Sequence, residues 1–255
     1  ESMGKFHSQL DIHPFRRYHE KRMEVGFHLS KSQETNQKPV PRISIPKYTL
    51  CEELINAISH GVGALFGVAA LVLCLVRAIS GGRGAASIAG ACVFGSTLIL
   101  LYTVSTLYHA LKINKAKRVF RVLDHCTIFL LIAGTYTPYT LVTLQGSVGW
   151  LLFTVIWAAA ALGVTLNAVN LRKYAVVSVF CYLAMGWAIV FAIRPLSAAM
   201  APAGVTLLIW GGIAYTVGAI LYAIGSKRKY FHSIFHFFCL IGSMLHFLSI
   251  YQYVL

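Results

Sequence analysis

Long apolar stretches dominate the chain from residue 48 onward, whereas residues 1–47 are polar. Seven apolar segments follow one another, each longer than about 20 residues and therefore able to cross a hydrocarbon core of about 30 Å as an α-helix. They run over residues 53–79, 84–111, 122–144, 147–170, 174–194, 200–224 and 230–254. Inside a bilayer the backbone polar groups have no water partners, so helices are the expected form of these spans.

The spacing of these segments predicts an all-α integral membrane protein with seven transmembrane helices. We expect two parts: a polar, basic N-terminal tail over residues 1–47 and a seven-helix membrane domain over residues 48–255. The polar composition of the tail is typical of a mobile or interfacial segment rather than a folded domain. Its first 30 residues hold no apolar run, so we expect no cleavable signal peptide.

The composition agrees with this class. Hydrophobic residues make up 57% of the chain and charged residues only 12%, whereas soluble domains carry about 25% charged residues. A soluble domain is therefore excluded, and we expect a multi-pass protein of the cell (plasma) membrane.

The basic residues predict an orientation. If the seven segments alternate in direction, nineteen of the 22 lysines and arginines fall on one side of the membrane. Basic residues accumulate on the cytoplasmic side, so the N-terminus is predicted inside and the C-terminus outside. The net charge of +14 then reflects topology and attraction to anionic lipid headgroups. We expect membrane lipids as partners and no nucleic acid; the oligomeric state stays open.

Ionisable residues are rare in the membrane domain but gather at one predicted depth. Asp124 is the only carboxylate after Glu53. It begins the third segment, while His109 ends the second, and His232 and His236 begin the last. With the predicted topology all four lie near the cytoplasmic face. Because ionisable groups inside a membrane are costly, such a cluster indicates a functional site.

The residue types in this cluster favour a metal centre. His232 and His236 are four residues apart and share one helix face, the pair geometry used in zinc helices. His109 would complete a three-histidine zinc site with an open position, where a bound water has a pKa of about 7. Asp124 is then the expected general base. Two alternatives remain: the histidines are an interfacial pair without metal, or Asp124 is a fourth ligand that closes the site.

Four motifs carry a family resemblance. In chain order they are Ser105-Thr-Leu-Tyr-His109, Arg121-Val-Leu-Asp124-His125, Ile132-Ala-Gly-Thr-Tyr-Thr-Pro138 and His232-Ser-Ile-Phe-His236. Together with the stretch from Glu52 to Gly61, they resemble the bacterial hemolysin III family, which belongs with the progestin and adipoQ receptors, including the adiponectin receptors. The resemblance covers about residues 45–255. One departure is Phe235, where bacterial members often have Trp.

The resemblance implies a zinc site near the cytoplasmic face. The zinc ligands of adiponectin receptors match His109, His232 and His236, the aspartate that holds the zinc-bound water matches Asp124, and the motif serine matches Ser105. Those receptors and the similar alkaline ceramidases hydrolyse the amide of ceramide. This implies a zinc-dependent hydrolase of a lipid amide or ester with a ceramide-like substrate. Bacterial members are instead named for haemolysis and often described as pore-forming.

Three functions therefore compete: a zinc hydrolase with Asp124 and Ser105 as catalytic residues, a membrane-perturbing or pore-forming cytolysin with a structural zinc, and a receptor or sensor of lipid state. A structural zinc usually has four protein ligands, and only three histidines fit well here. No segment carries a charged stripe of the kind that lines a pore. The sequence thus favours the hydrolase.

Four further residues have open roles. Glu53 and His60 are seven residues apart and share one helix face; they form either an interfacial pair or, for Glu53, a group that tunes the metal site. His125 is turned about 100° from its neighbour Asp124, so we expect it to cap the interface rather than bind metal. His246 lies about 21 Å along the helix from His232, too far to bind the same ion.

Overall fold

The computed structural model describes residues 45–225 and 228–255. The described residues are helical, without a strand: α2 (Leu50–Ser80), α3 (Ala85–Ala110), α4 (Lys115–Pro138), the π-helix η1 (Tyr139–Leu144), α5 (Gly146–Trp187), the 3-10 helix η2 (Ala188–Ala192), α6 (Ile193–Ala199), α7 (Pro202–Gly225) and α8 (Phe231–Tyr253). Among the described residues, six helical stretches are long and apolar enough to cross a membrane. The prediction of an all-α multi-pass membrane protein is confirmed, while residues 1–44 of the predicted tail lie outside the described residues.

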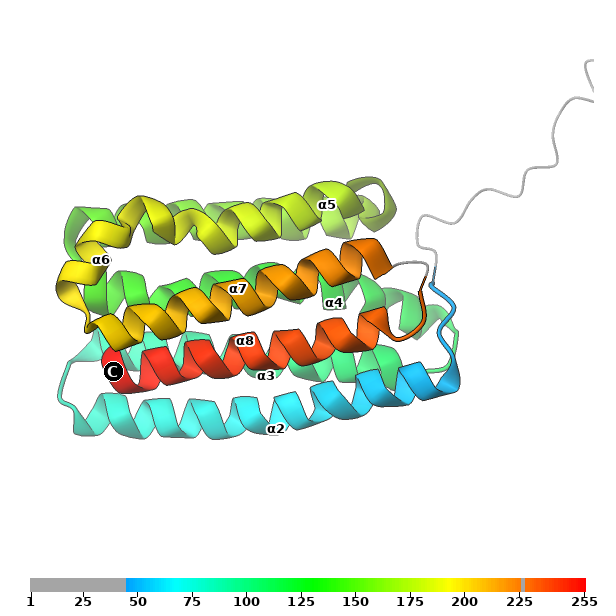
Figure 1. Ribbon diagram of the computed structural model, residues 1–255, viewed down its shortest axis with the longest axis horizontal. Coiled ribbons are helices and arrows are strands. Elements are labelled where there is room, and N and C mark those ends of the chain that lie inside the picture. Colours follow the sequence, from blue (N-terminus) through cyan, green and yellow to red (C-terminus); the bar gives the residue numbers. More distant parts are fainter. Residues whose placement is uncertain (1–44, 226–227) are drawn as a thin grey trace, which may run out of the picture. The chain divides into compact units, whose positions relative to one another are not determined.

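The long helices lie side by side, and their contacts join distant parts of the sequence (Figure 1). α2 packs against both α3 and α8, α3 packs against α4, and α7 packs against α8. The start of α2, the turn between α3 and α4 and the start of α8 lie at the same end of the described helices (Figure 1). This arrangement brings the histidines of α3 and α8 to one level, as the sequence predicted.

Two glycines allow α2 to approach its neighbours closely. A Cβ atom on Gly63 would lie 2.6 Å from Cδ1 of Tyr102, and one on Gly67 would lie 3.1 Å from the backbone nitrogen of Ile99. At Gly61 the nearest atom would be 3.8 Å away, an ordinary contact. Small residues allow close helix packing, and the geometry requires a glycine at Gly63 and Gly67 but not at Gly61.

A capping box begins α2, and one of its residues, Glu52, also contacts the start of α8. The backbone nitrogen of Glu52 donates to the Thr49 hydroxyl, and the Glu52 carboxylate accepts from the Thr49 backbone nitrogen at 2.8 Å. The same carboxylate accepts a hydrogen bond from the backbone nitrogen of Tyr230 at 2.7 Å. Tyr230 has φ of 65° and directly precedes α8. The first turn of α2 is thus tied to the start of the helix that carries two of the three clustered histidines.

The predicted boundary between the fourth and fifth segments coincides with a break in the helix. The helical stretch Gly146–Ala199, 54 residues long, is interrupted within α5 at Asn170, with φ of −159° and ψ of 85°. Two helices meet there. The Asn170 side chain accepts a hydrogen bond from the backbone nitrogen of Lys173 at 3.1 Å, so the asparagine acts as an N-cap. Arg172 and Lys173 lie inside the second of these helices.

The third predicted segment also begins earlier than its apolar residues indicate. α4 starts at Lys115 instead of residue 122 and ends at Pro138, after which η1 continues as a π-helix. A proline within a helix frees one carbonyl, and the hydroxyls of Thr135 and Thr137 donate to the nearby carbonyls of Leu131 and Ala133. The helix thus changes from α to π directly after Pro138.

Candidate metal centre

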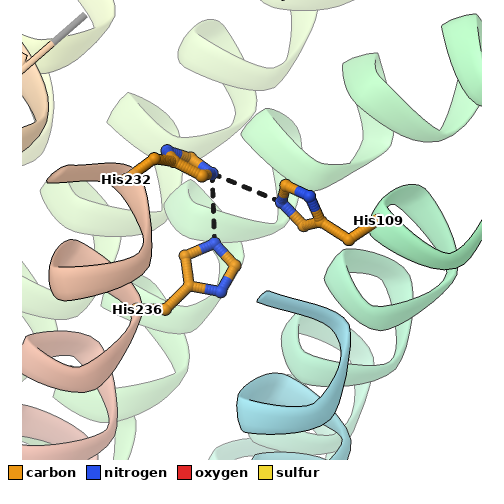
Figure 2. A group of neighbouring side chains, drawn as sticks. All are labelled: His109, His232 and His236. Carbon is orange, nitrogen blue, oxygen red and sulfur yellow. Dashed lines mark hydrogen bonds between the residues drawn. The ribbon is translucent and has the colours of Figure 1, made fainter. Parts of the chain in front are cut away.

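Three imidazoles from two helices point toward one another (Figure 2). His109 is at the end of α3, and His232 and His236 are in the first two turns of α8. Nε2 of His232 is 3.3 Å from Nε2 of His109 and 3.1 Å from Nε2 of His236. One ligand atom from each residue lies within 4.8 Å of the others, so the three could hold a metal ion.

The donor atoms fit a cation. His109 donates through Nδ1 to Glu53, so its neutral ring presents a bare lone pair at Nε2. That lone pair faces two further ring nitrogens, and neighbouring lone pairs favour a shared positive ion. Among the described residues, Nδ1 of His232 and Nδ1 of His236 have no hydrogen-bond partner. Imidazole sets suit zinc and several other transition metals, and three histidines are a donor set of catalytic zinc sites.

Glu53 links His109 to a buried lysine. One oxygen of its carboxylate lies 2.7 Å from Nδ1 of His109, and the other lies 2.6 Å from Nζ of Lys117. Lys117 also donates to the carbonyl of Leu111 at 3.0 Å, and its side chain is only 2% exposed. Lys117 precedes the third predicted segment, residues 122–144, but it already belongs to α4, which starts at Lys115.

The two histidines of α8 are held by ring stacking. His60 stacks on His236 with ring centroids 3.6 Å apart and planes 16° apart. Tyr48 stacks on His232 at 5.0 Å and 20°. Burial raises the pKa of the Tyr48 phenol, so it packs as a neutral ring. The sequence proposed no role for Tyr48 and treated His60 only as a partner of Glu53; no spacing rule links either residue to α8.

The predicted catalytic residues lie around the triad. Asp124 is not part of the group of clustered ligand atoms, but it lines the same cavity as His232. Ser105 is buried on α3, one turn before His109. His125 donates through Nδ1 to the carbonyl of Arg121 at 2.9 Å, and it is not part of the group of clustered ligand atoms.

His246 has a hydrogen-bond partner outside the three-histidine group. It lies within 3.1 Å of the carbonyl of Leu208, to which its Nε2 can donate. It is not part of the clustered ligand atoms of His109, His232 and His236.

A cavity of about 200 Å³ extends from the metal centre between the helices. Its polar end includes Asp124, His125, Tyr222 and His232. The remainder is mostly apolar, with side chains from α4, α5, α7 and α8, among them Leu131, Ile132, Val179, Leu183, Trp187 and Leu208. An elongated apolar molecule with a polar end matches this distribution.

Comparisons with known proteins place these features in a family. A family model described as Haemolysin-III related matches residues 48–247. Hemolysin-3 of Bacillus cereus is 42% identical over 204 residues, which is 80% of this chain and 92% of that protein. A Hemolysin-3 homolog of Bacillus subtilis (strain 168) is 39% identical over 81% of this chain and 96% of its own length. The human monocyte to macrophage differentiation factor is 26% identical over 64% of this chain and 69% of its own length.

Proposed function

The chain belongs to the haemolysin-III related family, and from this membership and its metal centre we propose that it is a zinc-dependent hydrolase of lipid amides or esters. The observation that carries the proposal is the position of the three-histidine group beside one end of a largely apolar cavity. A membrane lipid has a polar linkage attached to long apolar chains. Such a molecule could place its linkage at the histidines while its chains fill the cavity.

His109, His232 and His236 would hold the zinc. When bound, zinc supplies Lewis acidity that activates a carbonyl group and a water molecule for attack. Asp124 accepts the proton of the attacking water, since it is the carboxylate that shares the cavity with His232. Ser105, one turn from His109 on α3, does not line the cavity and would support His109 rather than touch the substrate. The apolar lining excludes bulk water and orients the acyl chain.

The cavity supports a ceramide-like substrate class, namely an N-acyl or O-acyl lipid. We place the protein in the plasma membrane with seven spans, a cytoplasmic N-terminus and an external C-terminus. The break at Asn170 supports the seventh span, because an unbroken helix of 54 residues would be about 81 Å long at 1.5 Å per residue. This is more than twice the thickness of a hydrocarbon core of about 30 Å.

The name Hemolysin-3 of two relatives favours a second candidate, a membrane-perturbing cytolysin in which the metal has a structural role. The two functions differ in what they require of Asp124. A hydrolase needs its carboxylate for proton transfer, whereas lysis by a metal-stabilised fold needs only the histidines.

The test compares the parent protein with Asp124→Asn in lipid nanodiscs loaded with zinc. Hydrolysis of a fluorogenic long-chain N-acyl amide should fall by about 10²–10⁴-fold in the variant, the usual contribution of a general base, while bound zinc is retained. His125→Asn is the matched control, since it lines the same cavity without an assigned catalytic role.

The same proteins are also added to dye-loaded liposomes, and the leakage of dye is measured. Full hydrolysis by the Asp124→Asn protein would refute the assigned role, and loss of its zinc would make Asp124 a ligand. Equal leakage by parent and variant, with no hydrolysis by either, would favour the cytolysin.

A further inference from the structure

Only one of the three clustered histidines is fixed by a hydrogen bond at Nδ1. His109 bonds through this atom to the Glu53 carboxylate at 2.7 Å. For His232 and His236 the same atom is buried, and it has no partner among the residues that the structure describes; stacked rings hold these side chains in place. The orientation and tautomer of His109 therefore depend on Glu53 in a way that the other two rings do not share.

The orientation of Glu53 depends in turn on Lys117. The lysine holds the second carboxylate oxygen at 2.6 Å and is anchored by the carbonyl of Leu111. With its side chain 2% exposed, Lys117 cannot turn to solvent without leaving a buried ion unpaired, which is strongly destabilising. The lysine thus holds one oxygen of Glu53 and leaves the other facing His109.

We propose that Glu53 and Lys117 form a positioning pair that keeps His109 as its Nδ1–H tautomer, with Nε2 free to bind the metal. The proposal rests on the proposed function only in taking His109 as a ligand. A carboxylate can only accept at His109, so the proton must be on Nδ1. The side-chain nitrogen of Asn56, which would require Nδ1 to accept, is farther away at 3.5 Å than the carboxylate oxygen at 2.7 Å. Hydrogen-bond partners of this kind typically change metal affinity by about 10–100-fold.

The pair makes an unusual prediction for Glu53→Gln. Glutamine has one oxygen and one NH₂ group, and Lys117 can bind only the oxygen. The NH₂ group then faces His109 and requires Nδ1 to accept, which transfers the ring proton to Nε2 and blocks metal binding. When Lys117 is also replaced by Met, the amide can rotate and present its oxygen to His109. The double variant should therefore bind metal more tightly than Glu53→Gln alone.

The experiment uses the full chain in detergent and measures the zinc dissociation constant by competition with a fluorescent chelator. Glu53→Gln should weaken binding by about 10–100-fold. Lys117→Met should weaken binding less than Glu53→Gln does, because the carboxylate remains but loses the partner that holds its second oxygen. The zinc affinity of the double variant should lie between those of the parent and Glu53→Gln. Because both replaced side chains are then uncharged, the double variant also provides a test if Lys117→Met does not fold.

A second readout needs no metal. NMR spectra of the zinc-free parent with ring-¹⁵N-labelled histidine should show His109 with a protonated Nδ1 and a bare Nε2. The His109 signals are identified because they are missing in His109→Gln. In Glu53→Gln the proton of His109 should be on Nε2 and Nδ1 should be bare. A merely structural role of Glu53 would not produce this change of tautomer.

Three results would overturn the proposal: unchanged zinc binding in Glu53→Gln, weaker binding in the double variant than in Glu53→Gln, or an unchanged tautomer. Failure of the proposed function looks different. A parent that shows this binding pattern but hydrolyses no lipid would refute the hydrolase and leave the positioning pair intact.

Discussion

Replacing Glu52 by Gln should loosen the start of α8 and thereby weaken metal binding, although Glu52 is far from the three histidines in the sequence. Its carboxylate accepts from the backbone nitrogens of Thr49 and Tyr230 at 2.8 and 2.7 Å, and from the Thr49 hydroxyl at 2.8 Å. The residue is 5% exposed, so water cannot replace a lost partner. Tyr230 is two residues before His232, which makes the effect on the metal centre direct.

The magnitude follows from the number of acceptors. The carboxylate uses both oxygens, one toward each helix start, and glutamine has only one acceptor oxygen. At least one charge-assisted hydrogen bond is lost, which costs about 1.5–3 kcal/mol. If the zinc-bound protein is destabilised more than the zinc-free protein by about half of this free energy, zinc binding weakens by roughly 3–10-fold, since 1.4 kcal/mol corresponds to a factor of ten.

Thr49→Ala is the matched control. It removes the capping hydroxyl at a cost of about 1 kcal/mol but leaves the bond from Tyr230 to Glu52 intact. Thermal unfolding with and without zinc, together with the zinc dissociation constant, is measured for both variants. Both should be less stable than the parent, and only Glu52→Gln should lose zinc affinity. Equal zinc affinity in the two variants would refute the link between α2 and α8.

Three further predictions concern the triad, the helix packing and the cavity. Changing both His232 and His236 to Ala should remove most of the roughly one equivalent of zinc per chain that a single three-histidine site holds, as measured by elemental analysis; retention of zinc would place the metal elsewhere. Gly63→Ala should cost about 1–3 kcal/mol by overpacking against a tyrosine ring 2.6 Å from the new Cβ, whereas Gly61→Ala should be nearly neutral in the same unfolding assay. Gly212→Leu should project into the cavity and reduce hydrolysis of long-chain more than short-chain amides with zinc unchanged; equal loss for both chain lengths would argue against acyl binding there.

The sequence alone predicted the three-histidine group because the signals that mark its members are local. His232 and His236 share a helix face by spacing, and His109 ends a recognisable apolar segment. Hydropathy then placed the ends of these helices together, and the geometry agrees: all three ring nitrogens lie within 4.8 Å.

The groups around the triad could not be predicted in this way. Lys117 lies in a polar stretch that hydropathy assigns to a loop, yet α4 already includes it. The contact from Glu53 to His109 joins residues 56 positions apart, and stacking of His60 on His236 depends on the rotation of α2 about its axis. Such contacts follow from how helices pack, which no periodicity in one chain specifies.

The two adjacent carboxylates of α2 impose a rule on insertions and deletions. Successive helical residues point about 100° apart, which allows Glu52 to reach α8 while Glu53 reaches α3 and α4. Gly63, farther along the same helix, fixes its rotation against α3. One residue added or removed between Glu53 and Gly63 would turn both carboxylates away from their partners. Length changes should therefore be excluded from the first half of α2 and tolerated in the exposed turn around Gly82, where the space beside the backbone is open although its φ of 64° favours glycine.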